Sequence, residues 1–200
     1  MRLSEYKKIM NFTYLEYCDY LQQKYGIGIS DYMTKNFNKN KKVTRTKEGL
    51  FAHHKFEDHA IMLSTKDVAM SCPFEWQLAK NIVYCDFLEH LFLHILICEY
   101  PSPERLQQYG LGVGGVLNFI VPELNDLYSG WQPAQEWRRT CFEKVSNDID
   151  CYFALLKHFK FSCKNHYYDG CFFKSYNEPF GLWSREKNQA LFNKIKSILD

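Results

Sequence analysis

The stretch from residue 53 to residue 94 decides the fold. It opens with HH at 53–54 and closes with NIVYCDFLEHLFLH at 81–94. Four of the chain's seven histidines belong to these two segments: His53, His54, His90 and His94. Because helix residues four apart lie on one face, a helix would present the last two imidazoles side by side. We therefore expect this stretch to bring histidines from separate elements to one place.

Two short strands and a helix are expected here. Residues 48–57 are interpreted as a strand with His53 and His54 at its end, and with a kink there, since successive strand side chains point to opposite faces. Residues 81–85 are short and β-branched, which is typical of a strand. Asp86 is the expected N-cap of a helix over 87–99, with Glu89 in the capping-box position. That helix is apolar nearly all round, so we expect it to be buried.

Outside this core the chain is predicted to be helical. An apolar stripe predicts one helix over 3–24, ended by Gly26. Residues 64–67 could cap a short helix, and Pro73 breaks the chain after it. The chain is expected to turn helical again after Pro101 and Pro103, and helical spacing recurs over 116–128, 134–147, 149–160 and 185–199. The predicted fold class is α+β, mostly α-helical.

The 200 residues, 46% of them apolar, are expected to form a single domain. Its parts are an N-terminal helix and turn (1–34), a basic segment (35–47), a small strand–strand–helix core (48–100) and a helical C-terminal region (101–200). The glycine-rich residues 110–115 lack the Lys-Ser/Thr of a phosphate-binding loop, so they are interpreted as a loop or a close helix contact. Trp131, Trp137 and Tyr152 are interpreted as packing residues.

Charge is unevenly distributed along the chain, although the net charge is only +2. Residues 35–47 carry six basic and no acidic side chains, whereas 48–200 carry 15 basic and 19 acidic ones. A basic run is most often a solvated face. Beside a phosphodiester site, however, such side chains neutralise phosphates and supply much of the affinity for nucleic acid. The candidates for this role, in a loop or exposed strand, are Lys39, Lys41, Lys42, Arg45 and Lys47.

The eight cysteines are expected to be reduced, in a cytoplasmic protein. The sequence has no Cys-x-x-Cys pair and does not open with a secretory signal pattern. The longest apolar run, 91–98, is too short to span a bilayer, so no membrane partner is expected. Cys163, His166 and Cys171 could supply three ligands of a small zinc site, but no fourth ligand stands at a standard spacing.

The four histidines of the central stretch suit the hydrolysis of a phosphodiester. That reaction needs an activated water and a cation on the phosphoryl and leaving oxygens. Three neutral imidazoles can hold one divalent ion. A fourth histidine outside the coordination sphere can accept a proton from water, because imidazole ordinarily titrates near neutral pH. Taken singly, each histidine is more simply explained as a core or surface residue.

The order and spacing of these residues resemble the HNH, or ββα-metal, nuclease family, and within it the colicin-type DNases most closely. The resemblance covers 53–94. It implies that His53, His90 and His94 are ligands of one divalent ion (Mg, Mn, Ni or Zn). It also implies that His54 is the general base, and that Asn81 orients the loop carrying that base.

The chain departs from the colicin-type motif at two places. The connection from His54 to Asn81 is longer, and the acidic residue found two positions before the histidine pair is Phe51 here. Glu57 or Asp58 could instead enter the metal shell, since carboxylates suit hard cations. With neither a signal peptide nor receptor-binding or translocation regions expected, the analogy favours a nuclease of a phage or mobile element over a secreted toxin.

Our leading hypothesis is a metal-dependent endonuclease that cuts DNA with little sequence preference. An RNA nuclease is an alternative, because the same ion and base would serve either polymer. Another is an inactive HNH-like protein that binds or inhibits a protein partner, such as a host or phage defence nuclease. The last is a helical domain whose histidines only hydrogen-bond within a core. The oligomeric state is left open.

Overall fold

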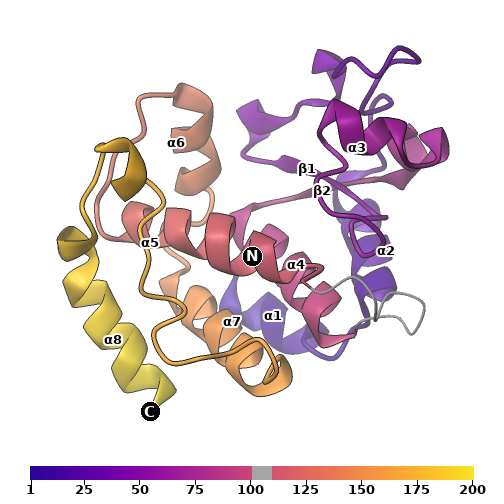
Figure 1. Ribbon diagram of the computed structural model, residues 1–200. Helices are drawn as coiled ribbons and strands as arrows, with labels where there is room; N and C mark the ends of the chain where they lie inside the picture. Colours follow the sequence, from indigo (N-terminus) through magenta and orange to yellow (C-terminus); the bar gives the residue numbers. More distant parts are fainter. Residues whose placement is uncertain (101–109) are drawn as a thin grey trace.

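The computed structural model describes residues 1–100 and 110–200 (Figure 1). The chain is mixed α+β and mostly helical, and its described part contains one two-stranded antiparallel sheet. The strands and α-helices are α1 (Leu3–Ile9), α2 (Tyr14–Tyr25), β1 (Phe51–His54), α3 (Lys66–Met70), β2 (Ile82–Cys85), α4 (Phe87–Glu99), α5 (Val121–Tyr128), α6 (Glu136–Glu143), α7 (Ile149–Ser162) and α8 (Gln189–Leu199). Among these residues, none of the helices combines the length and the apolar character that crossing a bilayer requires.

The strand–strand–helix unit forms within the predicted ranges, although β1 covers only 51–54 of the predicted 48–57. β1 pairs with β2 so that His53 lies opposite Val83 and His54 opposite Ile82. α4 covers the predicted residues 87–99, and nearly all of its side chains are buried. It packs against α7, α2 and both strands, and Figure 1 shows it between the sheet and the helices α1 and α7. The helix that carries two of the histidines is therefore also the centre of the hydrophobic core.

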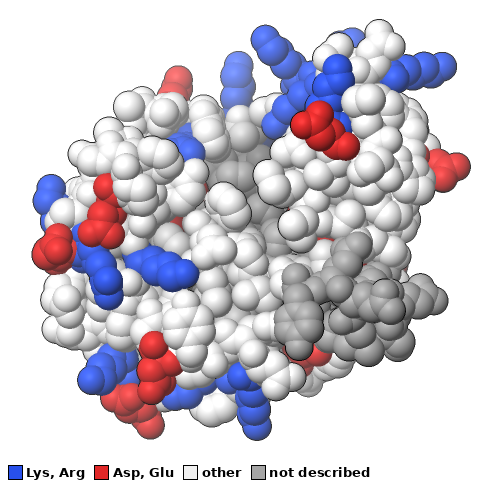
Figure 2. All heavy atoms as spheres, in the orientation of Figure 1, with Lys and Arg blue, Asp and Glu red and all other residues white. Residues whose placement is uncertain are grey.

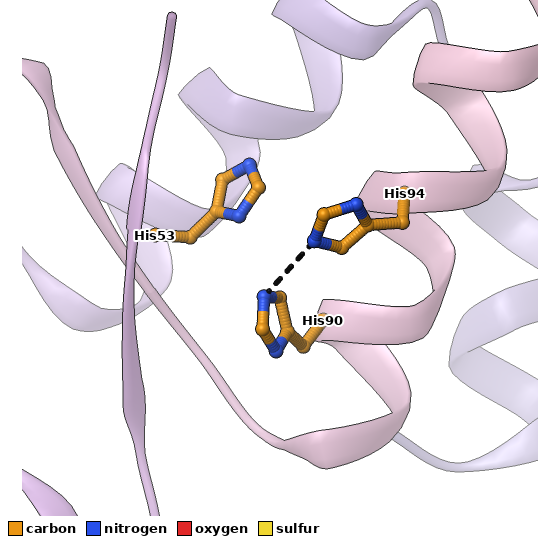
Figure 3. A group of neighbouring side chains, drawn as sticks. All are labelled: His53, His90 and His94. Atoms are coloured by element: carbon orange, nitrogen blue, oxygen red, sulfur yellow. Dashed lines mark hydrogen bonds between the residues drawn. The ribbon is translucent and has the colours of Figure 1, made fainter. Parts of the chain in front are cut away.

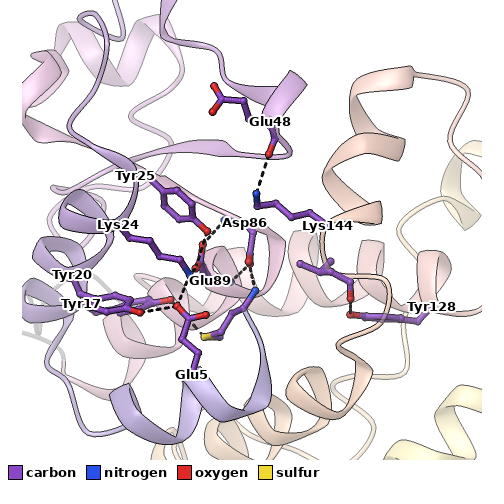
Figure 4. Close-up of polar contacts among 12 residues, drawn as sticks. Glu5, Tyr17, Tyr20, Lys24, Tyr25, Glu48, Asp86, Glu89, Tyr128 and Lys144 are labelled. Atoms are coloured by element: carbon purple, nitrogen blue, oxygen red, sulfur yellow. Dashed lines mark hydrogen bonds and ion pairs between the residues drawn. The ribbon is translucent and has the colours of Figure 1, made fainter.

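The predicted capping box at the start of α4 is confirmed, and it is buried. The Asp86 carboxylate accepts a hydrogen bond from the backbone N–H of Glu89 (2.8 Å), and the Glu89 carboxylate accepts one from the backbone N–H of Asp86 (2.7 Å). Lys24 of α2 forms an ion pair with Glu89 (2.7 Å), and the Met1 amino group contacts Asp86 (Figure 4). These contacts fix where the chain leaves β2 and enters α4.

Two expectations for the helices need correction. The helix predicted over 3–24 is two helices, because Thr13 and Glu16 form a second capping box that starts α2 after a break. Gly26 ends α2 as predicted, with a φ of 82°. Trp137 is not a packing residue, since 41% of its surface is exposed on α6, whereas Trp131 and Tyr152 are buried.

The remaining expectations for local structure hold in most respects. The short helix after residues 64–67 is α3, with Thr65 at its N-cap position, and Pro73 follows it before a 3-10 turn. The last helix is preceded by a 3-10 turn at Arg185–Asn188. A π-helical segment, Gly115–Ile120, precedes α5. The predicted return to helix just after Pro101 and Pro103 lies outside the described residues. All eight cysteines are free thiols, as expected.

The two capping boxes allow a direct comparison of their effects on stability. Thr13→Ala at the exposed cap of α2 should lower the free energy of unfolding by about 1 kcal/mol. Asp86→Ala should cost more, because it also leaves the buried N–H of Glu89 without an acceptor, which adds about 1–3 kcal/mol. Urea denaturation of both variants measures the difference, and equal losses would contradict a structural role for the buried cap.

Candidate metal centre

Three of the four predicted histidines converge on one point. His53 comes from β1, and His90 and His94 come from successive turns of α4 (Figure 3). Each offers one ring nitrogen, and the three nitrogens lie within 4.8 Å of one another. The strand pairing and the capped entry into α4 produce this approach, because they set the distance between β1 and the first turns of the helix.

The spacing of these nitrogens suits a metal ion. The Nε2 atoms of His90 and His94 are 3.3 Å apart. Two nitrogens bound to one tetrahedral zinc ion at its usual bond length are separated by about 3.4 Å. His53 is buried, whereas His90 and His94 are of intermediate exposure.

Tyr14, on the first turn of α2, orients the imidazole of His53. Its hydroxyl lies 2.9 Å from Nε2 of His53 and 3.2 Å from the backbone carbonyl oxygen of His54. A carbonyl can only accept, so the tyrosine proton points to it, and the hydroxyl oxygen accepts a hydrogen bond from Nε2–H of His53. The lone pair of His53 is then on Nδ1, the nitrogen that faces the centre. A hydrogen-bonded partner of this kind sets the tautomer that a metal ligand needs.

Glu57 is the carboxylate at this centre. Its Oε2 atom lies 3.5 Å from Nδ1 of His53 and 3.5 Å from Nε2 of His94. Those separations equal the spacing expected between ligands of one ion, so Glu57 could be a fourth ligand. The chain turns just after β1, where the backbone N–H of Glu57 donates to the carbonyl of His54 (3.0 Å). The kink predicted at the histidine pair is this turn, which brings Glu57 back over both imidazoles.

Burial sets the protonation of the centre. It lowers the pKa of His53 to about 3, although the Glu57 carboxylate opposes the shift. Burial also lowers the pKa values of His90 and His94. Burial alone would raise the pKa of Glu57, but the neighbouring imidazoles hold it well below its usual value. Burial therefore favours neutral imidazoles at His53, His90 and His94, which is the form in which imidazoles bind metals.

His54 lies beside the triad, not within it. Its ring is fully buried against Tyr32, with the ring centroids 4.2 Å apart. Gln77 donates through Nε2 to the Leu63 carbonyl (3.1 Å), so its Oε1 atom accepts from Nε2–H of His54 (3.1 Å). The other ring nitrogen of His54, Nδ1, faces Glu57 and lies 3.6 Å from its Oε1 atom. Glu57 thus separates this histidine from the three others.

Asn81 ties down the long connection between the strands. The side-chain amide of Asn81 donates a hydrogen bond to the backbone carbonyl of Glu75 (2.7 Å). The backbone carbonyl of Asn81 accepts one from the backbone N–H of Lys55 (2.9 Å). The first bond holds the turn that carries Gln77, the residue that binds His54. Among the described residues no hydrogen bond joins the side chain of Asn81 to the triad, so its link to His54 runs through the turn that carries Gln77.

The five candidate nucleic-acid contacts of the basic segment divide into one structural residue and four exposed ones. Arg45 forms an ion pair with Glu48, donates to the Tyr25 carbonyl (2.6 Å) and stacks on Tyr84, so its expected role in gripping nucleic acid is not supported by this geometry. The other side chains are exposed and have no ion-pair partner among the described residues: Lys39, Lys41, Lys42 and Lys47. Figure 2 shows lysines and arginines gathered at the edge of the molecule that this segment forms.

The glycine-rich residues make the close helix contact that the sequence suggested. A Cβ atom at Gly115 would lie 2.3 Å from Nδ1 of His94, and one at Gly112 would lie 2.6 Å from the His94 carbonyl oxygen. Gly112 also has a φ of 77°, which favours glycine. The absence of a side chain at Gly115 leaves room for the imidazole of His94.

The second metal site considered from the sequence does not form. In the part of the chain that the structure describes, the histidine triad is the one group placed to bind an ion. Cys163 instead donates from its thiol to the Ile95 carbonyl (3.7 Å) within the core.

The sequence did not predict the roles of Tyr14, Gln77 and Gly115 at this centre, because those roles depend on contacts between distant elements.

No protein-family model matches the chain, and searches of curated proteins and of solved structures found no significant match.

We expect the chain to bind one divalent transition-metal ion, with affinity that depends on the triad. His90→Ala should weaken Zn²⁺ binding by more than about 100-fold, and Tyr14→Phe by about 10- to 100-fold, because Tyr14 acts only through His53. Equilibrium dialysis followed by metal analysis measures both. His166→Ala, which removes a histidine far along the chain, is the control. Undiminished binding by His90→Ala would show that the triad is not the site.

Two adjacent glycines provide a test of the room left for His94. Gly115→Ala should displace the imidazole and weaken Zn²⁺ binding, because the added Cβ would lie within 2.7 Å of three ring atoms. Gly114→Ala is the matched control, since its nearest neighbour would be Asn118 at 4.0 Å and its backbone is already helical. Calorimetric titration of both variants, after circular dichroism has checked their fold, should reveal a defect in Gly115→Ala alone. Equal affinities would contradict the steric account.

Proposed function

We propose that the chain is a metal-dependent endonuclease with an HNH, or ββα-metal, core, and that its expected substrate is DNA. The observation that carries the proposal is the convergence of His53, His90 and His94 beside a fourth histidine, His54, in a strand–strand–helix unit. The exposed lysines of the basic segment lie in the chain just before β1, where they can neutralise phosphates.

The residues present fit a bound divalent cation. Nδ1 of His53 is buried, has no hydrogen-bond partner among the described residues and faces the carboxylate of Glu57. A buried acceptor of this kind costs free energy unless something binds it. A cation held by the triad, with Glu57 as a possible fourth ligand, would satisfy both groups. Because imidazoles suit Ni²⁺ and Zn²⁺ better than Mg²⁺, the donor set favours a transition metal.

In this proposal, each residue has a separate task. A divalent ion at the triad would polarise the phosphodiester and stabilise the leaving oxygen. His54 accepts a proton from the attacking water at Nδ1, while Gln77 keeps the other ring proton on Nε2. The Glu57 carboxylate, 3.6 Å from Nδ1, then stabilises the positive charge that forms on His54. Asn81 holds the turn that carries Gln77.

Plasmid nicking tests this assignment. The wild-type chain should nick supercoiled plasmid in the presence of Mn²⁺, Ni²⁺ or Zn²⁺, and His54→Ala should be slower by about 100-fold or more. Because His54 lies outside the triad, the same variant should still bind Zn²⁺. Parallel reactions with a structured RNA show whether DNA or RNA is the substrate.

The control for this experiment is His166→Ala, which should cut as fast as the wild-type chain. Equal cleavage by the wild-type chain and His54→Ala would remove His54 from the mechanism. No cleavage with any of the ions would refute the nuclease proposal and leave the inactive, protein-binding alternative.

A further inference from the structure

A cavity of about 330 Å³ lies between the basic segment, β1 and α6. Its lining includes three aromatic rings (Tyr32, Phe51 and Trp137), the cationic side chain of Lys39 and the hydroxyl-bearing side chains of Thr44 and Thr46. Cavities of this size hold small organic ligands. It is too small to admit a base pair with both backbones, but it matches one flat aromatic group with a polar edge.

The aromatic lining is arranged for stacking. Trp137 is 41% exposed, whereas most large aromatic side chains of this chain are buried or half-buried. Its ring lies 5.3 Å from the guanidinium carbon of Arg138, and the ring of Tyr32 lies 5.0 Å from Nζ of Lys39. Tyr32 is buried, so Trp137 is the exposed ring of the pair, and an exposed ring beside cations is a usual platform for a nucleobase.

The two walls of the cavity are held together before any ligand binds. Lys144, just after α6, donates to the Glu48 carbonyl of the basic side (3.2 Å; Figure 4). Gly49 allows this approach, since a Cβ there would lie 2.9 Å from the Lys144 side chain and 3.1 Å from the Thr140 carbonyl oxygen. Because the cavity is already formed, a ligand would not have to order its walls on binding.

Single aromatic rings separate the cavity from the metal centre. Phe51 lines the cavity and stacks on His90, with ring centroids 5.6 Å apart. Tyr32 lines the cavity and packs on His54, with ring centroids 4.2 Å apart. A nucleotide bound in the cavity would therefore lie next to a phosphodiester at the triad.

We propose that this cavity binds one unpaired nucleotide, with its base stacked on Trp137 and its phosphate at Lys39. The inference deepens the proposed function, on which it rests for the identity of the polymer, by assigning a preference for single-stranded or locally unpaired nucleic acid. The exposed Lys41, Lys42 and Lys47 lie in the same segment and continue the backbone contact beyond the cavity.

Binding measured in EDTA tests the inference without any cleavage. The probe is a fluorescent oligothymidylate of about eight nucleotides, compared by anisotropy with a duplex of the same length. The single strand should bind the wild-type chain at least about tenfold more tightly. Trp137→Ala should weaken binding of the single strand by about tenfold, because base stacking is lost, and Trp137→Phe should retain most of it. Lys39→Ala should also weaken it.

Matched variants control for surface and charge effects. Phe161→Ala removes another exposed ring that lies beside a lysine, Lys160, on α7, and Lys164→Ala removes one exposed positive charge elsewhere. Both should bind the probe as the wild-type chain does. If thymidine monophosphate displaces the probe, the cavity binds a free nucleotide. If it does not, binding also needs the flanking phosphates of the strand. Both outcomes agree with the proposal.

Two results would overturn the inference: equal affinity for single strand and duplex, or unchanged binding by Trp137→Ala. The outcomes remain distinct from those of the plasmid experiment. Binding of the single strand through Trp137 with no cleavage would refute the nuclease proposal alone. Cleavage without this binding would refute the nucleotide pocket alone.

Discussion

The candidate metal centre depends on the junction at which β2 becomes α4. The capping box of Asp86 and Glu89 starts the helix at a defined residue, so His90 and His94 face β1 and not the core. Pairing of β1 with β2 then places His53 opposite them. Because Asp86 and Glu89 are buried, and Lys24 of α2 binds Glu89, the junction is also fixed against the N-terminal helices. A shift of one residue at this junction would turn the two helical imidazoles away from β1.

Local sequence was enough to predict the elements of this unit. The i, i+4 histidines, the Asp-x-x-Glu cap and the β-branched run at 81–85 are short-range signals, and each corresponds to the element observed. The same reasoning joined α1 and α2 into one helix, because the apolar stripe continues through the break while the Thr13 cap is a weaker signal. It also assigned Trp137 to packing, since periodicity cannot distinguish an exposed ring from a buried one.

The residues that complete the centre could not be predicted in the same way. Glu57 was considered beside Asp58, but only the turn after β1 shows which carboxylate reaches the imidazoles. Tyr14 and Gln77 set the tautomers of His53 and His54 from elements far away in the chain. Arg45 was expected to contact nucleic acid, yet three structural contacts occupy it. Such roles arise from packing between elements, which no short sequence pattern records.

The position of Tyr14 in the first turn of α2 links the buried centre to an exposed helix end. This turn begins at the exposed cap formed by Thr13 and Glu16, and helix ends fray more readily than helix interiors. Each opening of the turn would free the hydroxyl from His53 and let that ring exchange tautomers. In the proposed role of the centre, its affinity for a cation would include the free energy of keeping the first turn of α2 helical. Solvent conditions or a partner that stabilised this helix end would then tighten cation binding without contacting any of the proposed ligands.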